Sequence, residues 1–284
     1  MKKLHWILLA FFSVAAAALR RWQLLTGFDA AGLPVKGNPG GLGLLFLLLA
    51  AMAVFILPCL KLRGGRSDED REMAAYFPAG KTLSAAFGIG GAFLLAASAV
   101  LSLLSYRSSL VETLLPVFLL ASAAATLFVV FALFRGSQPE GVFLLIPVCY
   151  LALHLIFLYR EDASDPILSH YAVALLAVAA LTAAMLENAA FAFRNGAPRI
   201  FLFVGSLAVI LSFAAAAELQ SLAWLLFFVG FAFVELAFLS GASLRPAEYR
   251  HRKRTPFGVL FLFDGRLDEK KLLSLASIKI KGAC

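Results

Sequence analysis

Residues 167–193 read ILSHYAVALLAVAALTAAMLENAAFAF. The run is long enough to cross the hydrocarbon core of a bilayer, which requires about 20 mainly apolar residues in a helix. Its one carboxylate is Glu187, and an ionisable side chain inside such a run is costly and marks a candidate functional site. We therefore predict a transmembrane helix here and treat Glu187 as a candidate functional residue.

Seven further apolar stretches share this character. Hydrophobic residues make up 62% of the chain, against about 45–50% in soluble domains, so a soluble fold could not bury them all. The sequence predicts an all-α, polytopic helical membrane bundle over residues 1–244, followed by a basic tail over residues 245–284. We place the eight transmembrane helices at residues 4–19, 42–60, 83–104, 114–134, 142–159, 167–193, 200–217 and 222–239.

The distribution of positive charge predicts the orientation of the bundle. Most of the 25 Lys and Arg residues fall at the N-terminus, in alternate connections and in the tail. Cytoplasmic loops collect positive charge, so both termini are predicted to be cytoplasmic, in a bacterial cytoplasmic membrane. The predicted outer connections hold only Arg20, Arg21, Lys36, Arg107 and Arg160.

The first apolar stretch has a second interpretation as a secretory signal peptide. The alanines from Ala15 to Ala18 offer an A-x-A cleavage pattern. Arg20 and Arg21 follow directly, however, and positive charge at the start of a mature chain disfavours export. An even number of crossings, which two cytoplasmic termini require, also favours a retained first span.

The tail is predicted to bind the anionic headgroups of the cytoplasmic leaflet. Each Lys or Arg close to such a surface adds about 1 kcal/mol of attraction. This interpretation accounts for the formal charge of +8 without a nucleic-acid partner. The basic cluster comprises Arg245, Arg250, Arg252, Lys253 and Arg254, and the apolar run at residues 257–263 is a candidate surface for a protein partner.

Polar residues within the predicted spans gather near the inner face. Glu187 lies seven residues before Arg194, or about 10 Å along a helix from the inner boundary. Its helical neighbours are alanines, which favours a position facing the bundle. Asn188 lies at the same depth, and Glu235 lies in the inner part of the last span. These three residues are candidates for a transport or binding site.

His154 is a fourth candidate but lies deeper. It follows Gly141 by thirteen residues, which places it about 20 Å from the inner face. A direct acid–base pair with either glutamate is therefore not expected. A solvated outer rim is predicted for Arg160, Glu161, Asp162, Asp165, His170 and Glu218, with no metal-site spacing.

The positions of small residues predict which helices are central. Ser84, Gly88, Ala92 and Ala96 recur every fourth residue, a pattern that permits close helix contact, and the sixth span has a similar row. We therefore expect the third and sixth spans at the centre and the Phe-rich stretch 224–238 at the lipid-facing perimeter. Between the second and third spans, Met73, Tyr76 and Phe77 predict a short helix on the membrane surface.

No catalytic motif that would assign an activity is present. The chain lacks the P-loop, H-E-x-x-H, G-x-S-x-G and paired C-x-x-C patterns, and its three cysteines are too few and too scattered for a disulfide framework or a metal cluster. No cofactor is predicted. The leading hypothesis is a small permease for an unidentified small molecule, with an inner vestibule near Glu187. The alternative is a non-enzymatic membrane sensor or assembly subunit that acts through its tail. A membrane-embedded enzyme is disfavoured because the buried polar residues are few.

Overall fold

The computed structural model describes residues 3–28, 35, 38–61, 73–105, 110–162 and 168–242. Within these ranges every regular element is a helix, and eight of the helices are long and apolar enough to cross a membrane. The predicted all-α class and the eight membrane-length helices are therefore confirmed. The cytoplasmic position of both termini stays a prediction.

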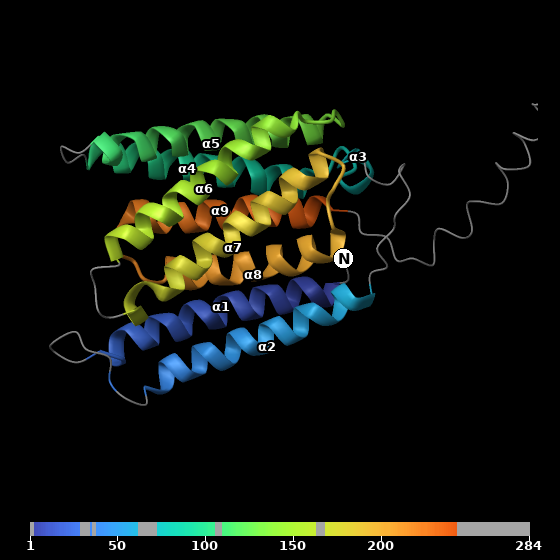
Figure 1. The fold of residues 1–284 in the computed structure, drawn as a ribbon. Coiled ribbons are helices and arrows are strands. Elements are labelled where there is room, and N and C mark those ends of the chain that lie inside the picture. The colour runs from blue at the N-terminus through green and yellow to red at the C-terminus, as the bar shows by residue number, and fades with distance from the viewer. Residues whose placement is uncertain are drawn as a thin grey trace, which may run out of the picture. The chain divides into compact units, whose positions relative to one another are not determined.

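Seven of the long helices begin and end within four residues of the predicted spans (Figure 1). The first helix differs, because it continues to Thr26, beyond the predicted end at residue 19, and so contains Arg20 and Arg21, which were predicted to lie in a connection. A ninth helix in the described ranges, α3 (Met73–Tyr76), has only four residues. The eight long helices are α1 (Lys3–Thr26), α2 (Pro39–Lys61), α4 (Thr82–Leu104), α5 (Leu110–Phe134), α6 (Gly141–Asp162), α7 (Leu168–Ala192), α8 (Pro198–Ala216) and α9 (Leu222–Gly241).

Successive long helices run in opposite directions, so the start of α1 and the end of α9 lie at the same end of the bundle (Figure 1). We call this the basic end, because Lys81, Arg135, Arg194 and Arg199 lie there, at or next to helix termini. The other end is called the Arg20 end, after the residue near the end of α1.

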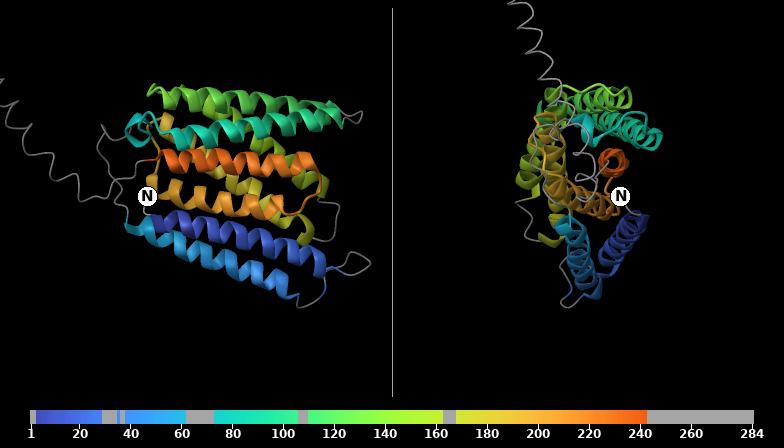
Figure 2. Two further views of the ribbon diagram at one scale, coloured as in Figure 1. Left: turned by 180° about the vertical axis from the view of Figure 1, so that it is seen from behind. Right: turned by 90° about the vertical axis from the view of Figure 1, so that its right-hand side faces the viewer.

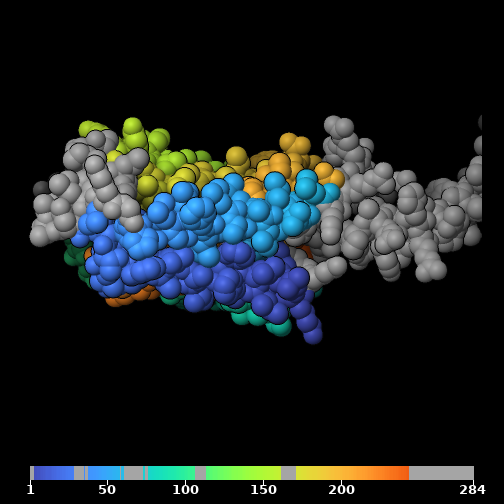
Figure 3. Space-filling view, turned by 90° about the horizontal axis from the view of Figure 1, so that it is seen from below, coloured from blue at the N-terminus to red at the C-terminus, as the bar shows by residue number. Residues whose placement is uncertain are grey.

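Six helices form a closed circuit of neighbours. The contacts run from α4 through α5, α6, α7 and α8 to α9, and α9 packs back against α4. The hairpin of α1 and α2 lies outside this circuit and packs on α8 (Figure 2). The two helices cover one face of the bundle (Figure 3), and the exposed apolar residues of α1 include Ile7 and Val14, as expected of a surface that contacts lipid.

The central helices differ from those expected. In the spans of α8 and α9, 67% and 56% of the residues are buried, against 50% for α7 and 33% for α4. Phe227, Phe228 and Phe231 are buried inside the circuit, so the prediction that this stretch faces lipid is wrong. The physical reason is close backbone contact between α4 and α9 at Gly91 and Gly230, which places the aromatic face of α9 inside.

The short helix α3 also differs from its prediction. Met73 and Phe77 are buried, so they pack into the bundle and do not form an exposed membrane-binding surface. The Phe77 ring meets three other rings edge-on, at centroid distances of 5.7 Å to Phe191, 6.0 Å to Phe201 and 5.9 Å to Phe238. Such edge-to-face contacts add to the stabilisation from apolar burial. We call these four residues the aromatic layer.

Candidate functional site: a buried carboxylate–amide pair

The structure brings together two of the four candidate residues, Asn188 and Glu235. Asn188 lies in the last turns of α7 and Glu235 lies in the second half of α9, so both lie toward the basic end. Both side chains are fully buried. Asn188 Nδ2 donates a hydrogen bond of 3.0 Å to Glu235 Oε1. The pair thus links two helices that are far apart in sequence.

The surroundings of this pair are largely apolar. On α8, a methyl group added at Gly205 would lie 3.5 Å from Glu235 Oε2 and 3.3 Å from the side chain of Leu239. On α7, Met185 Sδ is 3.7 Å from Asn188 Nδ2, a weak contact. The absence of a side chain at Gly205 therefore leaves α8 close to the second carboxylate oxygen.

Two oxygen atoms of the pair have no hydrogen-bond partner among the described residues. They are Glu235 Oε2 and Asn188 Oδ1, and both are buried. No Lys or Arg in the described ranges pairs with Glu235. A buried carboxylate with no counter-ion and only one of its oxygens hydrogen-bonded is strongly unfavourable. The bundle therefore contains a buried carboxyl group, that of Glu235, whose ionised form its surroundings do not stabilise.

The aromatic layer separates the pair from the basic end. Phe191 follows Asn188 by three residues on α7, and Phe238 follows Glu235 by three residues on α9, so the layer lies about one helical turn nearer that end. Phe77 contacts both rings. The pair is consequently shielded on the side from which the predicted inner vestibule would be reached.

Glu187 occupies a different environment from its neighbour Asn188. Its side chain is half-buried, and its Oε2 accepts a long hydrogen bond of 3.4 Å from the backbone N–H of Ala197, the N-cap residue of α8. A negative charge next to a helix N-terminus is favourable. In this conformation Glu187 thus supports the α7–α8 turn, whereas Glu235 is bonded by Asn188.

His154 lies apart from the pair, on α6. Its ring stacks on Tyr150 at 5.7 Å and lies 4.9 Å from the ring of Phe227. Neither ring nitrogen has a hydrogen-bond partner among the described residues, and the same is true of Trp224 Nε1. The structure therefore places His154 in an aromatic cluster and not in the hydrogen-bonded pair.

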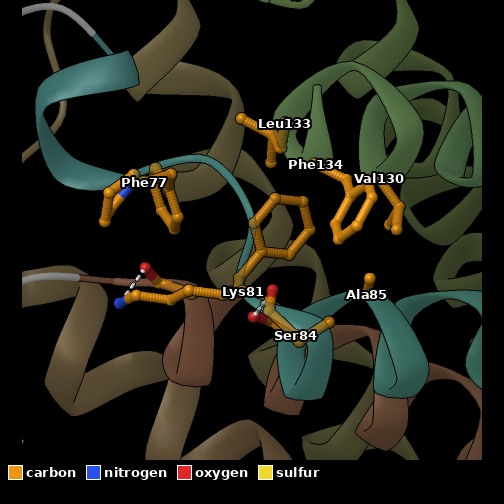
Figure 4. Close-up of a pocket in the computed structure, with 11 residues that line it drawn as sticks. Phe77, Lys81, Ser84, Ala85, Val130, Leu133 and Phe134 are labelled. Carbon is orange, nitrogen blue, oxygen red and sulfur yellow. Dashed lines mark hydrogen bonds between the residues drawn. The ribbon is translucent and has the colours of Figure 1, made fainter. Parts of the chain in front are cut away.

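A pocket at the basic end is too small for a substrate (Figure 4). It lies beside Phe77, Val130 and Phe134, and its volume of about 20 Å³ has room for about one water molecule. Lys81 Nζ donates a 2.8 Å hydrogen bond to the Gly241 carbonyl, and Ser84 Oγ donates one of 2.7 Å to the Ala237 carbonyl. Burial lowers the pKa of the Lys81 ammonium. These bonds fasten the start of α4 to the end of α9.

Sequence reasoning missed a second polar contact, between Arg20 and Glu218. Glu218 was expected in a solvated rim, but it is buried and its Oε1 lies 2.7 Å from Arg20 Nη2. The position of Arg20, in the last turns of an apolar helix, is the one sequence signal for a partner. Nothing in the spacing of the two residues identifies that partner, because the contact is set by the packing of α1 on α8.

The basic cluster predicted for the tail lies outside the described residues; it comprises Arg245, Arg250, Arg252, Lys253 and Arg254.

In the part of the chain that the structure describes, no group of three or more His, Cys, Asp or Glu side chains is arranged to hold a metal ion. Comparisons of the chain with protein-family models, curated proteins and solved structures found no match.

Proposed function

We propose that the protein is a small permease in which the Asn188–Glu235 pair couples substrate movement to an ion. The observation that supports this most is a fully buried carboxyl group, on a central helix, whose one hydrogen-bond partner among the described residues is a neutral amide. Ionisable groups inside a membrane bundle are costly and typically mark ion or substrate pathways. A structural hydrogen bond between α7 and α9 could be made by two neutral side chains.

In this proposal, the structure with the buried Asn188–Glu235 pair is the closed state of a transport cycle. The pair is covered by the aromatic layer, and Phe77, which directly follows α3, contributes to this layer from outside the long helices. Opening of this layer would expose the pair to the basic end. A permease must expose its site to the two faces in turn, and α7, α8 and α9 are the helices whose relative movement would do so.

Reconstitution tests this proposal. The purified chain is placed in proteoliposomes that contain dyes sensitive to pH and to sodium, and amino acids, sugars, nucleosides and dicarboxylates are added in turn. We expect one class to change the internal pH or the internal sodium concentration with wild-type protein and not with Glu235→Gln. The matched control is Glu187→Gln, which removes a carboxylate one residue from Asn188 and should retain the signal. Wild-type protein that responds to no class, or an unchanged Glu235→Gln response, contradicts the proposal.

One observation favours the alternative, a membrane sensor or assembly subunit. The interior around Asn188 and Glu235 is tightly packed, and the pocket at the basic end has room for about one water molecule. A protein that acts through partners does not need a path through its bundle. Pull-down with and without residues 245–284 tests this function, because a partner that binds through the tail is lost with it. A permease should keep its transport after the same truncation.

A further inference from the structure

The two unpartnered oxygen atoms of the buried pair have one simple joint explanation. Asn188 Oδ1 and Glu235 Oε2 are both acceptors, and each lacks a donor among the described residues. Asn188 Nδ2 already donates to Glu235 Oε1, which brings the amide and the carboxyl group together. We propose that Glu235 binds a proton on Oε2 and donates it to Asn188 Oδ1, so that acid and amide form a closed ring of two hydrogen bonds.

This inference deepens the proposed function and rests on it for its role, since it names the ion of the same site as a proton. One proton on Oε2 gives both oxygen atoms a part in a hydrogen bond, as is usual for buried polar groups. A hard metal cation such as Ca²⁺ needs six to eight oxygen ligands, and the pair offers two unpartnered oxygens beside Met185, Gly205 and Leu239.

The charged groups on the helices packed against α9 do not compensate an ionised Glu235. On α4, Lys81 precedes the first turn and donates to the Gly241 carbonyl. On α7, the Glu187 carboxylate accepts from the Ala197 N–H. On α8, Arg199 lies in the first turn, and no described residue, Arg199 included, bonds Glu235 Oε2. Loss of the proton would therefore leave an uncompensated buried charge.

Release of the proton requires the pair to open. The O–H bond at Oε2 breaks, the proton passes to a water molecule, and the carboxylate keeps the electron pair. Asn188 Oδ1 loses its donor in the same step, so water or an entering polar group must donate to both oxygen atoms. The aromatic layer excludes water in the closed state and so couples proton release to its opening.

Infrared spectroscopy of the full-length chain in lipid vesicles tests the inference without any substrate. We expect a C=O stretching band of a protonated carboxylic acid near neutral pH, lost in Glu235→Gln and retained in Glu187→Gln. Asn188→Leu should shift this band to higher frequency, because the acid loses its hydrogen-bonded partner. Absence of the band in folded wild-type protein, or its persistence in Glu235→Gln, overturns the inference.

Two further measurements in the infrared experiment separate a proton from a metal cation and cover the case of an unfolded variant. Sodium in place of choline should leave the band unchanged, and loss of the band with sodium would identify a metal-cation site and overturn the inference. If Glu235→Gln does not fold, the shift in Asn188→Leu carries the test, and an unshifted band would count against the ring. The band is read in the absence of transport, so failure of the permease proposal leaves this result intact.

Discussion

Arg20 and Glu218 form a buried ion pair that joins the end of α1 to the connection between α8 and α9. Arg20 Nη2 and Nε both donate to Glu218 Oε1, at 2.7 Å and 3.1 Å. The exposed fractions of the two side chains are 0% and 3%. Gln23 accepts from Arg20 Nη1, and Gln220 donates to Glu218 Oε2. The α1–α2 hairpin lies outside the six-helix circuit, and this network is one polar attachment of the hairpin to it; the 3.4 Å contact of His5 Nε2 with Ser206 Oγ is another.

Loss of one partner of this pair should destabilise the bundle. Arg20→Ala leaves the Glu218 carboxylate buried without its cation, and removal of one partner of a buried ion pair typically costs about 3–5 kcal/mol. We expect a clear fall in the thermal unfolding temperature of the purified protein in detergent. Arg21→Ala is the matched control, because Arg21 is exposed and its loss should have little effect.

Replacement of both partners gives a second, sharper expectation. Buried ion pairs can often be exchanged for apolar residues of similar volume at little or no cost. The double variant Arg20→Leu with Glu218→Leu should therefore be more stable than either single Leu variant. Purely additive effects in this double-mutant cycle would show that the two side chains do not interact.

The close contact between α4 and α9 depends on the absence of a side chain at Gly91 of α4. A Cβ atom at Gly91 would lie 2.8 Å from the Gly230 carbonyl oxygen and 2.9 Å from the Val234 backbone nitrogen. Backbone atoms cannot move aside without displacing α9, so Gly91→Ala should destabilise the protein by about 1–3 kcal/mol, as overpacking does.

Gly90→Ala is the control for this substitution. Among the described residues, a Cβ atom there meets only Phe233, at an ordinary distance of 3.7 Å, and alanine favours a helix over glycine by about 1 kcal/mol. The variant should be neutral or slightly more stable in the same unfolding measurement. Equal losses at positions 90 and 91 would contradict close backbone contact as the cause.

The number and extent of the helices could be predicted from the sequence because each depends on local hydrophobicity. The sequence did not predict which helices lie at the centre of the bundle. An apolar helix has the same composition whether it faces lipid or protein, so composition does not distinguish the buried Phe231 of α9 from the exposed Phe93 of α4. The row of small residues on α4 predicts close packing against another helix. It does not predict that this helix is α9, because the choice of partner depends on how the whole chain packs.

The candidate site could be predicted in part. Polarity within an apolar run was enough to single out Asn188 and Glu235, because few such residues occur in the spans. The hydrogen bond between them could not be foreseen, since the angle of each side chain about its helix depends on how α7, α8 and α9 pack. Adjacent residues on one helix point about 100° apart, which is why Glu187 and Asn188 have different surroundings.

Truncation of the amide should reveal the contribution of the pair to stability. Asn188→Ala leaves both Glu235 oxygens without a partner among the described residues, and a buried unsatisfied polar group costs about 1–3 kcal/mol. We expect a lower thermal unfolding temperature for this variant. Thr182→Ala on the same helix removes only a local bond to the Val178 carbonyl and should change stability much less. Equal stability of Asn188→Ala and wild type would show that the hydrogen bond contributes nothing.

Labelling of single cysteines tests the predicted orientation. Ser137 lies beyond α5 at the basic end, and Ser105 lies beyond α4 at the Arg20 end; both are exposed, and each hydroxyl bonds a carbonyl of its own helix. In a chain with the native cysteines replaced by alanine, Ser105→Cys should react with a membrane-impermeant maleimide on intact cells. Ser137→Cys should react only after permeabilisation, because positively charged connections stay on the cytoplasmic side. The reverse pattern would place the basic end outside and would remove the tail from the cytoplasmic leaflet.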